Sequence, residues 1–259
     1  MKNTRKNELA VCGIEAVKAL AKNHPESIRR FYYDDARTMD FKSLFSSLAS
    51  RKVPYNKVED SELEKLSGTV HHQGVVAMIE QPSIPHLTVE IADGWLHRKE
   101  SALLLDRVGN ANNLGAIVRS AAFFGVKNIV IPLDEAQSSV TTSSYRVAQG
   151  GMEYVNVYSI RSITKLLTAM KGKMIRFGTD VRAKTTVDKI PSLCEKKPAL
   201  IVLGNEEHGI SDEVRKNCDY LVLIPFGDNP DAKRPIESLN VAQAASIVLY
   251  ECRKLAGKE

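Results

Sequence analysis

Short runs of apolar and β-branched residues alternate with helical segments in the second half of the chain, and this alternation limits the possible folds most. The runs are ALLL (102–105), NIVIP (128–132), YVNVY (154–158), MIRF (174–177), ALIVLG (199–204) and YLVLIP (220–225). Strands that read as continuous apolar runs are buried on both faces, as in a parallel sheet covered by helices. The pattern therefore predicts an α/β domain with a mostly parallel sheet.

The first 80 residues carry a second, smaller α/β pattern. Segments with helical spacing of apolar residues and strand-like segments alternate here too, in 14–21, 31–33, 41–48, SELEKL and 74–79. We predict a small domain over residues 1–80. The segment QPSIPHLTVE that follows holds two prolines and shows no strong period. We interpret 81–97 as a linker to a larger domain over 98–259.

Charge and hydropathy narrow the classes of partner. The net charge of +5 is spread thinly along the chain, so it permits a nucleic-acid partner without requiring one. No apolar run approaches the roughly 20 residues that span a bilayer, so we expect no membrane association. The first ten residues, MKNTRKNELA, lack the apolar core of a secretory signal.

Cysteine and histidine spacing predicts neither a metal site nor a disulfide framework. The four cysteines are scattered and form no CxxC pair: Cys12, Cys194, Cys218 and Cys252. His71 and His72 precede a strand and lack ligand spacing, so we expect no metal. A reducing cytoplasm is the expected location.

Three apolar runs lead into loops of unusual composition, each followed by a helical segment. They are LLLDRVGNANN, LIVLGNEEHGIS and LVLIPFGDNPDAKRPIESLN. In parallel sheets, ligands bind beyond the carboxyl ends of the strands, where helix N-termini present free N–H groups. The chain has no GxGxxG sequence after its first such strand and no GxxxxGK[ST] sequence, which argues against a dinucleotide or P-loop site.

The stretch GNANNLGAIVRSAAFFG (109–125) contains a single charged residue, Arg119, among small residues. Arg119 falls off the apolar face of the predicted helix, and Gly115 and Ala116 leave room beside it for a guanidinium to meet a phosphate or a hydroxyl. On the helix pattern alone, a solvated arginine paired with a surface acid is the more common case. Asn112 and Asn113 could equally serve as helix N-caps.

The stretch SLNVAQAASIVLY (238–250) predicts a helix that is apolar or small almost all round, and therefore buried. Asn240 stands at its first turn, where a polar side chain without partners costs about 1–3 kcal/mol. Ser238 is a good N-cap for this helix in its own right. Glu206, in GNEEHG, has a capping or a surface role on this pattern alone.

Together, the three loops resemble the motifs of the SpoU (TrmH-like) branch of the SPOUT RNA methyltransferases. NNLGAIVRSAAFFG is similar to the first motif, LGNEEHGIS to the second, and IP with SLNVAQAASIVLYE to the third. They occur in the family's order and spacing over roughly residues 100–255. In the first 80 residues, CGIEAVKAL and HHQGVVA resemble the family's substrate-binding extension, which has the fold of ribosomal protein L30e.

The resemblance implies an α/β fold in which a C-terminal parallel-sheet domain with a trefoil knot follows a small L30e-like domain. It implies methyl transfer from S-adenosylmethionine to a ribose 2′-hydroxyl in structured RNA, either tRNA or rRNA, by a homodimer. Carried over by position, the catalytic residues are Asn113, Arg119, Glu206, Ser238 and Asn240. The residues that bind the cofactor are Gly204, Ile224 and Leu239.

The chain departs from the family's pattern in three places. GNANN stands where the family often has aspartate–proline before its asparagine, YRVAQGGMEYV replaces a serine–glycine–alanine run, and GDNPDAKRPIE is a longer insertion. Because these segments border the substrate side, they leave open a catalytically silent, RNA-binding relative of the same fold. A third alternative, a nucleotide-binding metabolic enzyme, has no phosphate motif in its favour.

Overall fold

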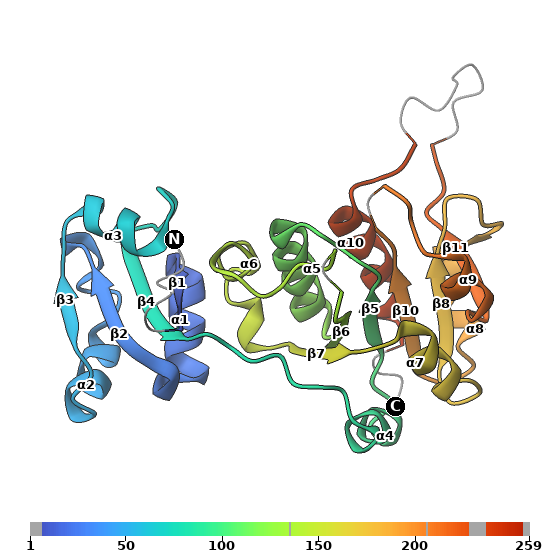
Figure 1. Cartoon of the computed structure of the whole chain (residues 1–259), viewed down its shortest axis with the longest axis horizontal. Coiled ribbons are helices and arrows are strands. Elements are labelled where there is room, and N and C mark those ends of the chain that lie inside the picture. The colour runs from blue at the N-terminus through green and yellow to red at the C-terminus, as the bar shows by residue number, and fades with distance from the viewer. Residues whose placement is uncertain (1–6, 135, 206, 228–236, 256–259) are drawn as a thin grey trace. The chain divides into compact units, whose positions relative to one another are not determined.

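The computed structural model describes residues 7–134, 136–205, 207–227 and 237–255 of the chain, which divides into two compact units (Figure 1). The first unit combines Met1–Ser83 with Ser139–Tyr154, and the second combines Ile84–Ser138 with Val155–Glu259. None of the helices in these described ranges has the length and apolar character needed to cross a membrane.

The first unit is built on a four-stranded mixed sheet with the strand order β1-β4-β2-β3. Strand β4 pairs with β1 and β2 in antiparallel orientation, and β3 runs parallel to β2. The elements, with η for 3₁₀ helices, are β1 (Glu8–Cys12), α1 (Ile14–Asn23), η1 (Pro25–Ser27), β2 (Ile28–Tyr33), η2 (Asp35–Arg37), α2 (Lys42–Ser50), β3 (Tyr55–Lys57), α3 (Asp60–Ser67), β4 (Val75–Glu80), α6 (Thr142–Ala148) and η3 (Gly151–Glu153).

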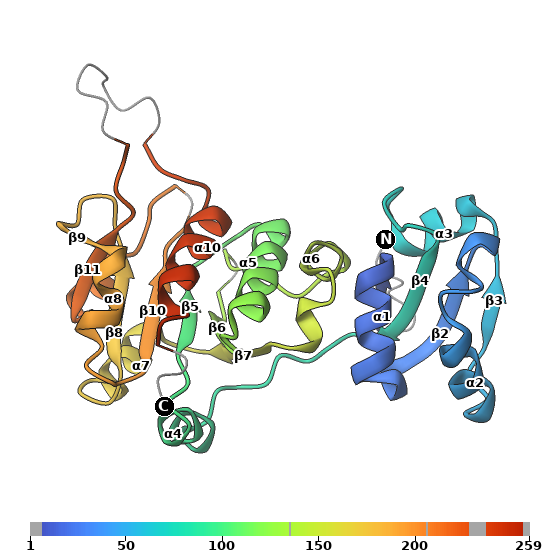
Figure 2. The same cartoon turned by 180° about the vertical axis from the view of Figure 1, so that it is seen from behind.

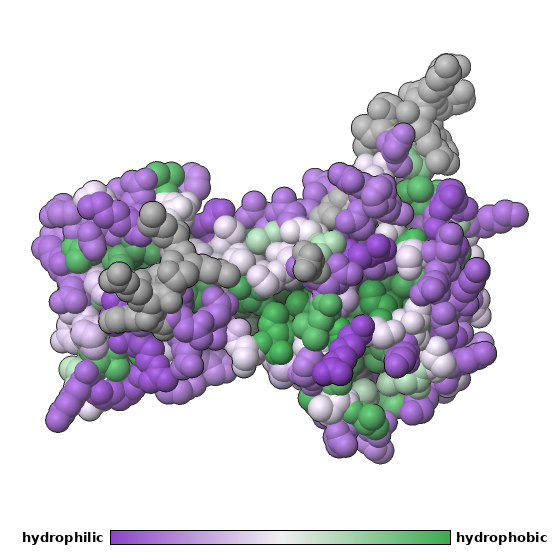
Figure 3. Space-filling view, in the orientation of Figure 1, coloured by the Kyte–Doolittle hydropathy of each residue, from purple (hydrophilic) through white to green (hydrophobic). Residues whose placement is uncertain are grey.

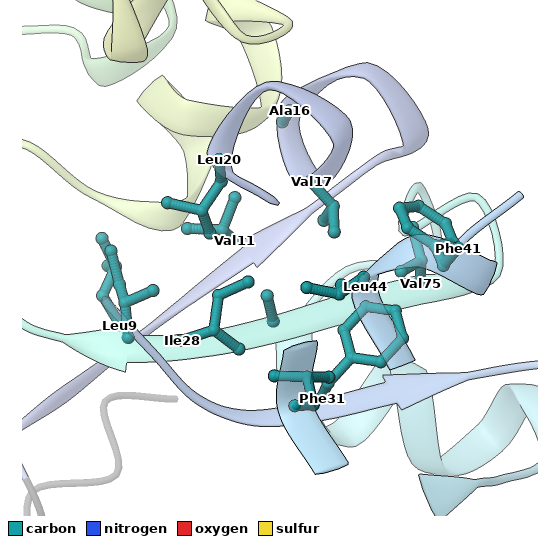
Figure 4. Packing of buried hydrophobic residues seen from close by; sticks show 13 residues of the cluster. Leu9, Val11, Ala16, Val17, Leu20, Ile28, Phe31, Phe41, Leu44 and Val75 are labelled. Carbon is teal, nitrogen blue, oxygen red and sulfur yellow. The ribbon is translucent and has the colours of Figure 1, made fainter. Parts of the chain in front are cut away.

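Helices cover this sheet because successive strand residues point to opposite faces. Figure 4 shows Val17 and Leu20 of α1 pointing toward the strands, in the same cluster as Phe31 of β2. The ring of Phe31 packs edge-on against Phe41, with the ring centroids 5.3 Å apart. A second buried cluster, which includes Leu63 of α3, collects the alternate strand residues.

The second unit contains a seven-stranded sheet with the order β7-β6-β5-β10-β8-β11-β9, in which all pairs are parallel. Its elements are α4 (Val89–His97), β5 (Ala102–Leu105), α5 (Ala111–Phe124), β6 (Asn128–Pro132), β7 (Asn156–Ile160), α7 (Ile163–Ala169), β8 (Ile175–Thr179), β9 (Thr185–Thr186), η4 (Val187–Lys189), α8 (Ile190–Leu193), β10 (Ala199–Leu203), α9 (Asp212–Lys216), β11 (Tyr220–Leu223) and α10 (Val241–Cys252).

Both faces of the parallel sheet are covered. Leu200 and Val202 of the central strand β10 share a core with Trp95 of α4 and Leu167 of α7. Ile201 points to the opposite face and is equally buried. Continuous apolar strands result from this double burial, so the predicted α/β class with a parallel sheet is confirmed.

Helices α5 and α10 lie side by side in both views of the chain (Figures 1 and 2). The Oγ atoms of Ser120 and Ser246 are 2.8 Å apart and join the two helices by a hydrogen bond. Buried alanines, Ala121 and Ala245, allow this close packing. Figure 3 shows hydrophilic residues over most of one side of the molecule and hydrophobic residues gathered where Figure 1 draws β5 to β7.

Local structure differs from the sequence-based prediction at two segments. β1 is a strand that the apolar pattern does not predict, because its run between Glu8 and Cys12 is short and follows a polar terminus. Part of the predicted linker, Val89–His97, forms helix α4, capped by Thr88 after the two prolines. The predicted domain boundaries stay a prediction. So does the trefoil knot, because part of the connection from β11 to α10 lies outside the described residues.

Candidate active site

The carboxyl ends of four parallel strands lie together, and the loops that follow them form the candidate site. Leu105, at the end of β5, pairs with Leu203, at the end of β10. The next N–H, that of Asp106, donates to the carbonyl of Leu203 at 2.8 Å. Strands β8 and β11 end alongside, with Thr179 opposite Val222. The loops expected to converge therefore do lie at one edge of the sheet.

Two asparagines from separate motifs meet at the starts of α5 and α10. Nδ2 of Asn240 donates a hydrogen bond to Oδ1 of Asn113 at 3.1 Å, and Oδ1 of Asn240 accepts one from the N–H of Ala242 at 2.9 Å. Because the hydrogen bond from the N–H of Ala242 uses the side-chain oxygen of Asn240, the side-chain nitrogen of Asn240 is directed to Asn113. The packing of the two helices thus fixes how both amides are presented.

The prediction that Ser238 caps the last helix is wrong. Helix α10 begins at Val241 with Asn240 as its N-cap, and Ser238 and Leu239 are exposed residues of the preceding loop. Only the residue directly before the first helical position can place a side-chain oxygen on the free N–H groups of the first turn. Asn240 therefore caps α10, the role that the sequence pattern assigns to Ser238.

Helix α5 presents Arg119 to solvent. Its N-cap is Asn110, whose Oδ1 accepts a hydrogen bond from the N–H of Asn112 at 2.8 Å, so Asn113 does not cap the helix. Arg119 is exposed, and within the described parts of the chain no acidic side chain pairs with it. Phe123, one turn later, is 82% exposed. The surface ion pair weighed for Arg119 thus has no support among these residues.

A cavity of about 750 Å³ opens among the loops that follow β8, β10 and β11 and the first turn of α10. The three residues expected to bind the cofactor, Gly204, Ile224 and Leu239, line it together, and so does Ser238. These residues come from two separate sequence motifs. Glu206, the remaining predicted catalytic residue, lies outside the described residues.

A tight turn after β10 forms one wall of this cavity. Asn205 and Gly209 exchange two backbone hydrogen bonds of 3.1 and 3.0 Å, and Gly209 has a φ of +66°. A Cβ atom at Gly204 would lie 2.2 Å from the carbonyl carbon of Gly209, closer than real atoms approach. Only glycine fits at Gly204, so the motif's first glycine is explained by the close approach of two backbone segments.

The loop after β5 is joined to this turn by contacts that the sequence analysis missed. The buried Asp106 accepts hydrogen bonds from the N–H of Ser211 at 3.2 Å and from Nε of Arg107 at 2.9 Å. The side-chain amide of Asn205 donates to the carbonyl of Arg107 at 2.9 Å. The hydrogen bond to Asp106 raises the pKa of Arg107. The only sequence signal was an aspartate directly after four apolar residues, which indicates no partner by itself.

A buried carboxylate also lines the cavity. The side chain of Asp180, at the end of β8, is 5% exposed and forms an ion pair with Arg215 of α9. Its Oδ1 accepts a hydrogen bond from the N–H of Arg182 at 2.8 Å. These contacts hold the loop after β8 in place. Sequence reasoning did not single out Asp180, because Arg215 becomes its neighbour only through tertiary structure.

Comparison with known protein families identifies the family to which the chain belongs. Residues 100–250, more than half of the chain, match the SpoU rRNA Methylase family. The chain belongs to this family. Residues 10–85 match a second family, RNA 2′-O ribose methyltransferase substrate binding. A SpoU methylase preceded by this domain is an RNA 2′-O-ribose methyltransferase, as the three motifs imply.

Individual relatives of this SpoU methylase extend over nearly its whole length. The 23S rRNA (guanosine-2′-O-)-methyltransferase RlmB of Nitrosomonas europaea is 32% identical over 93% of this chain and 89% of its own. RlmB of Acinetobacter baylyi is 30% identical over 95% and 97%. The crystal structure of the SpoU methyltransferase AviRb from Streptomyces viridochromogenes in complex with AdoMet has the same fold, with a TM-score of 0.72 and 23% identity over 98% of this chain and 93% of that one.

Proposed function

We propose that this SpoU methylase binds S-adenosylmethionine in the cavity lined by Gly204, Ile224 and Leu239. The cavity has the size of small-molecule sites, which are roughly 300–1,000 Å³. The absence of a side chain at Gly204 leaves backbone groups at its wall, and the similar AviRb structure was solved with AdoMet. The bound cofactor would supply an activated methyl group on a sulfonium. Calorimetric titration of the protein with S-adenosylmethionine tests the assignment.

The predicted catalytic residues have separate tasks in this proposal. A ribose 2′-hydroxyl is a weak acid, and in-line displacement requires that oxygen, carbon and sulfur be aligned. The paired amides of Asn113 and Asn240 orient the hydroxyl. Arg119 is too basic to accept a proton, so it binds the target's phosphate or ribose oxygen and stabilises the developing alkoxide, while the hydroxyl proton passes to solvent water. Glu206 and Ser238 complete the site.

The substrate that fits the comparisons best is a guanosine in 23S ribosomal RNA. The observation that carries this proposal is the match to two RlmB proteins over both domains, with 30–32% identity. The chain would then work in the cytoplasm, where its four free cysteines stay reduced.

Mapping 2′-O-methyl groups in ribosomal and transfer RNA from cells with and without the gene tests the substrate. We expect one guanosine of 23S rRNA to lose its methyl group in the absence of the gene, and to regain it when purified protein and S-adenosylmethionine are added. A lost site in transfer RNA would redirect the proposal. Unchanged methylation at every position would favour the catalytically silent relative.

The dimer that the resemblance implies would form on the exposed sides of α5 and α10. Apolar side chains are exposed on both helices: Phe123 by 82%, Tyr250 by 48% and Ile247 by 36%. The ring of Phe124 lies between Phe123 and Tyr250, at centroid distances of 5.0 and 6.2 Å. Light scattering coupled to gel filtration tests this, and Phe123→Ser should shift the protein toward monomer.

A further inference from the structure

Arg107 has a backbone conformation that its side chain disfavours. Its φ of +61° lies in the left-handed region, which non-glycine residues occupy only with backbone strain. Two contacts impose it here. The amide of Asn205 holds the carbonyl of Arg107, and Asp106 holds the side chain. A glycine would remove this strain, so replacing Arg107 by glycine removes the side chain without disfavouring the backbone conformation.

Among the described residues, the guanidinium of Arg107 is hydrogen-bonded along one edge. Its Nε and one terminal nitrogen, Nη2, donate to the two carboxylate oxygens of Asp106 at 2.9 and 3.4 Å. Asp106 is 2% exposed, whereas the side chain of Arg107 is 34% exposed. A guanidinium has five N–H donors in a plane, and the described residues take up those of Nε and Nη2.

Arg107 lies in the loop between the end of β5 and α5, the helix that carries Asn113. The carbonyl of Arg107 is bonded to Asn205, which lines the cavity. The carboxylate of Asp134 also acts on Arg107, but it is exposed and therefore screened by water. A planar cation held by a buried carboxylate beside a reaction site suits an anion with several oxygens, and RNA supplies such an anion at every nucleotide.

We propose that Arg107 binds a backbone phosphate of the RNA substrate and so adds to the affinity for the RNA whose ribose Asn113 and Asn240 orient. This inference rests on the proposed methyltransferase function and adds a residue that contacts the substrate. The buried Asp106 acts as a positioning residue, because it holds the guanidinium in the orientation that the phosphate meets.

The test compares Arg107→Gly, Arg107→Lys and the full-length parent on unmethylated 23S rRNA transcribed in vitro. Glycine suits the local backbone, but Arg107→Gly leaves the buried carboxylate of Asp106 without its charged partner, so a thermal melt of each variant accompanies the assays. For Arg107→Gly we expect the Kd for RNA and the KM to rise about tenfold with kcat little changed. Arg107→Lys should recover part of the lost affinity. The slope of log Kd against log salt should fall by about 0.7–0.9, the value for one phosphate contact. Lys173→Gln, an exposed cation at the amino end of β8, serves as the control with the same loss of charge.

Unchanged KM and salt slope in Arg107→Gly would overturn the inference. So would a weakening matched in Lys173→Gln, because the effect would then come from overall charge. If the parent binds the RNA but transfers no methyl group, the proposed function fails, while the salt slopes still decide whether Arg107 contacts a phosphate.

Discussion

At the scale of single residues, the amide of Asn240 serves two partners at once. Its oxygen accepts from the N–H of Ala242 and its nitrogen donates to Asn113, so the start of α10 and the candidate site share one side chain. The two roles can be separated, because an aspartate keeps the capping oxygen and loses the amide donor.

Asn240→Asp should fold like the parent and lose most of its activity. The carboxylate caps α10 and its charge suits a helix N-terminus, so we expect the free energy of unfolding to change by less than about 0.5 kcal/mol. Without the bond to Asn113, misplacement of the reacting groups should slow single-turnover methylation about 100-fold. Asn240→Ala should show the same rate loss and, in addition, about 1 kcal/mol of destabilisation. A parental rate in the aspartate variant would show that the amide pair plays no part in the reaction.

Arg119 should prove essential through its guanidinium and not through its charge alone. We expect Arg119→Ala to slow single-turnover methylation about 10²–10³-fold, because a donor to the developing alkoxide is lost. Arg119→Lys should restore little of this, since an ammonium group lacks the planar donor pair. The exposed Lys127, just beyond α5, provides a control when changed to Ala. Near-parental rates in both Arg119 variants contradict the assignment.

Sequence patterns located the candidate residues better than they explained them. The motifs placed Asn113 and Asn240 at the starts of two separate helices, and in the structure Nδ2 of Asn240 lies 3.1 Å from Oδ1 of Asn113. The exposure of Arg119 follows from its position off the apolar face of its helix. The cap was misassigned to Ser238, because a two-residue difference in a helix start is not visible in composition. Asp106 was overlooked because Ser211, which links it to the turn after β10, is distant in sequence.

At the scale of elements, an ion pair anchors β8 beside β11. Arg176 is buried, and its Nε and Nη2 donate to the carboxylate of Asp219 at 2.9 and 2.5 Å, while its Nη1 donates to the carbonyl of Leu167 at 3.0 Å. These strands end in loops that line the cavity. Hydrogen bonding to Arg176 lowers the pKa of Asp219.

Stability should therefore depend on pH through Asp219. Because its folded-state pKa lies below the unfolded value of about 3.9, its contribution is complete above that value and is lost as the pH falls through the folded-state pKa. We expect the free energy of unfolding in urea to fall more steeply with decreasing pH below about 4 in the parent than in Asp219→Asn. At neutral pH, Asp219→Asn should be destabilised by about 1.5–3 kcal/mol. Asp212→Asn, whose carboxylate is 89% exposed, should leave the curve unchanged.

The elements themselves were predicted where apolar runs were long and bounded. The six strands read from residues 102–225 are all present, because burial on both faces leaves an unmistakable composition. The two-residue strand β9 carries no such signal, since Thr185 and Thr186 are half-buried at a sheet edge. The turn at Gly204 could be predicted as a motif, but the backbone approach that requires glycine could not.

At the scale of the whole molecule, the first unit includes a stretch of chain from the middle of the sequence. Tyr145 of α6 packs against the apolar cluster of the first unit, and His24 lies 2.5 Å from the buried carboxylate of Glu153. A Cβ at Gly150, which has a φ of +90°, would lie 2.7 Å from the Cβ of Ala19 in α1. No pattern in the sequence indicates that residues 139–154 belong to the first unit, because they read as part of the following domain.

Fragments of the chain should report this composite construction. Because all described lining residues of the cavity belong to the second unit, we expect residues 84–259 to bind S-adenosylmethionine like the full chain but to bind RNA weakly. Residues 1–83 alone should melt at least about 4 °C below the same fragment fused to 139–154, since Tyr145 fills part of its core. Equal melting temperatures would show that the segment adds nothing to the first unit, and undiminished RNA binding by 84–259 would remove the role expected for the first.

The inclusion of 139–154 in the first unit also sets an order of events during protein synthesis. Ribosomes add about 5–20 residues per second, and N-terminal domains commonly fold before the rest of the chain is made. Here the first sheet is complete once Glu80 has emerged, yet the side chain of Tyr145 that covers part of its core is made several seconds later. The nascent N-terminal sheet therefore waits with apolar surface exposed until β5, α5 and β6 have also been translated. In this chain, the first unit becomes complete only after Tyr154 has been made, when β7, β8, β10, β11 and α10 of the second unit are still to be translated.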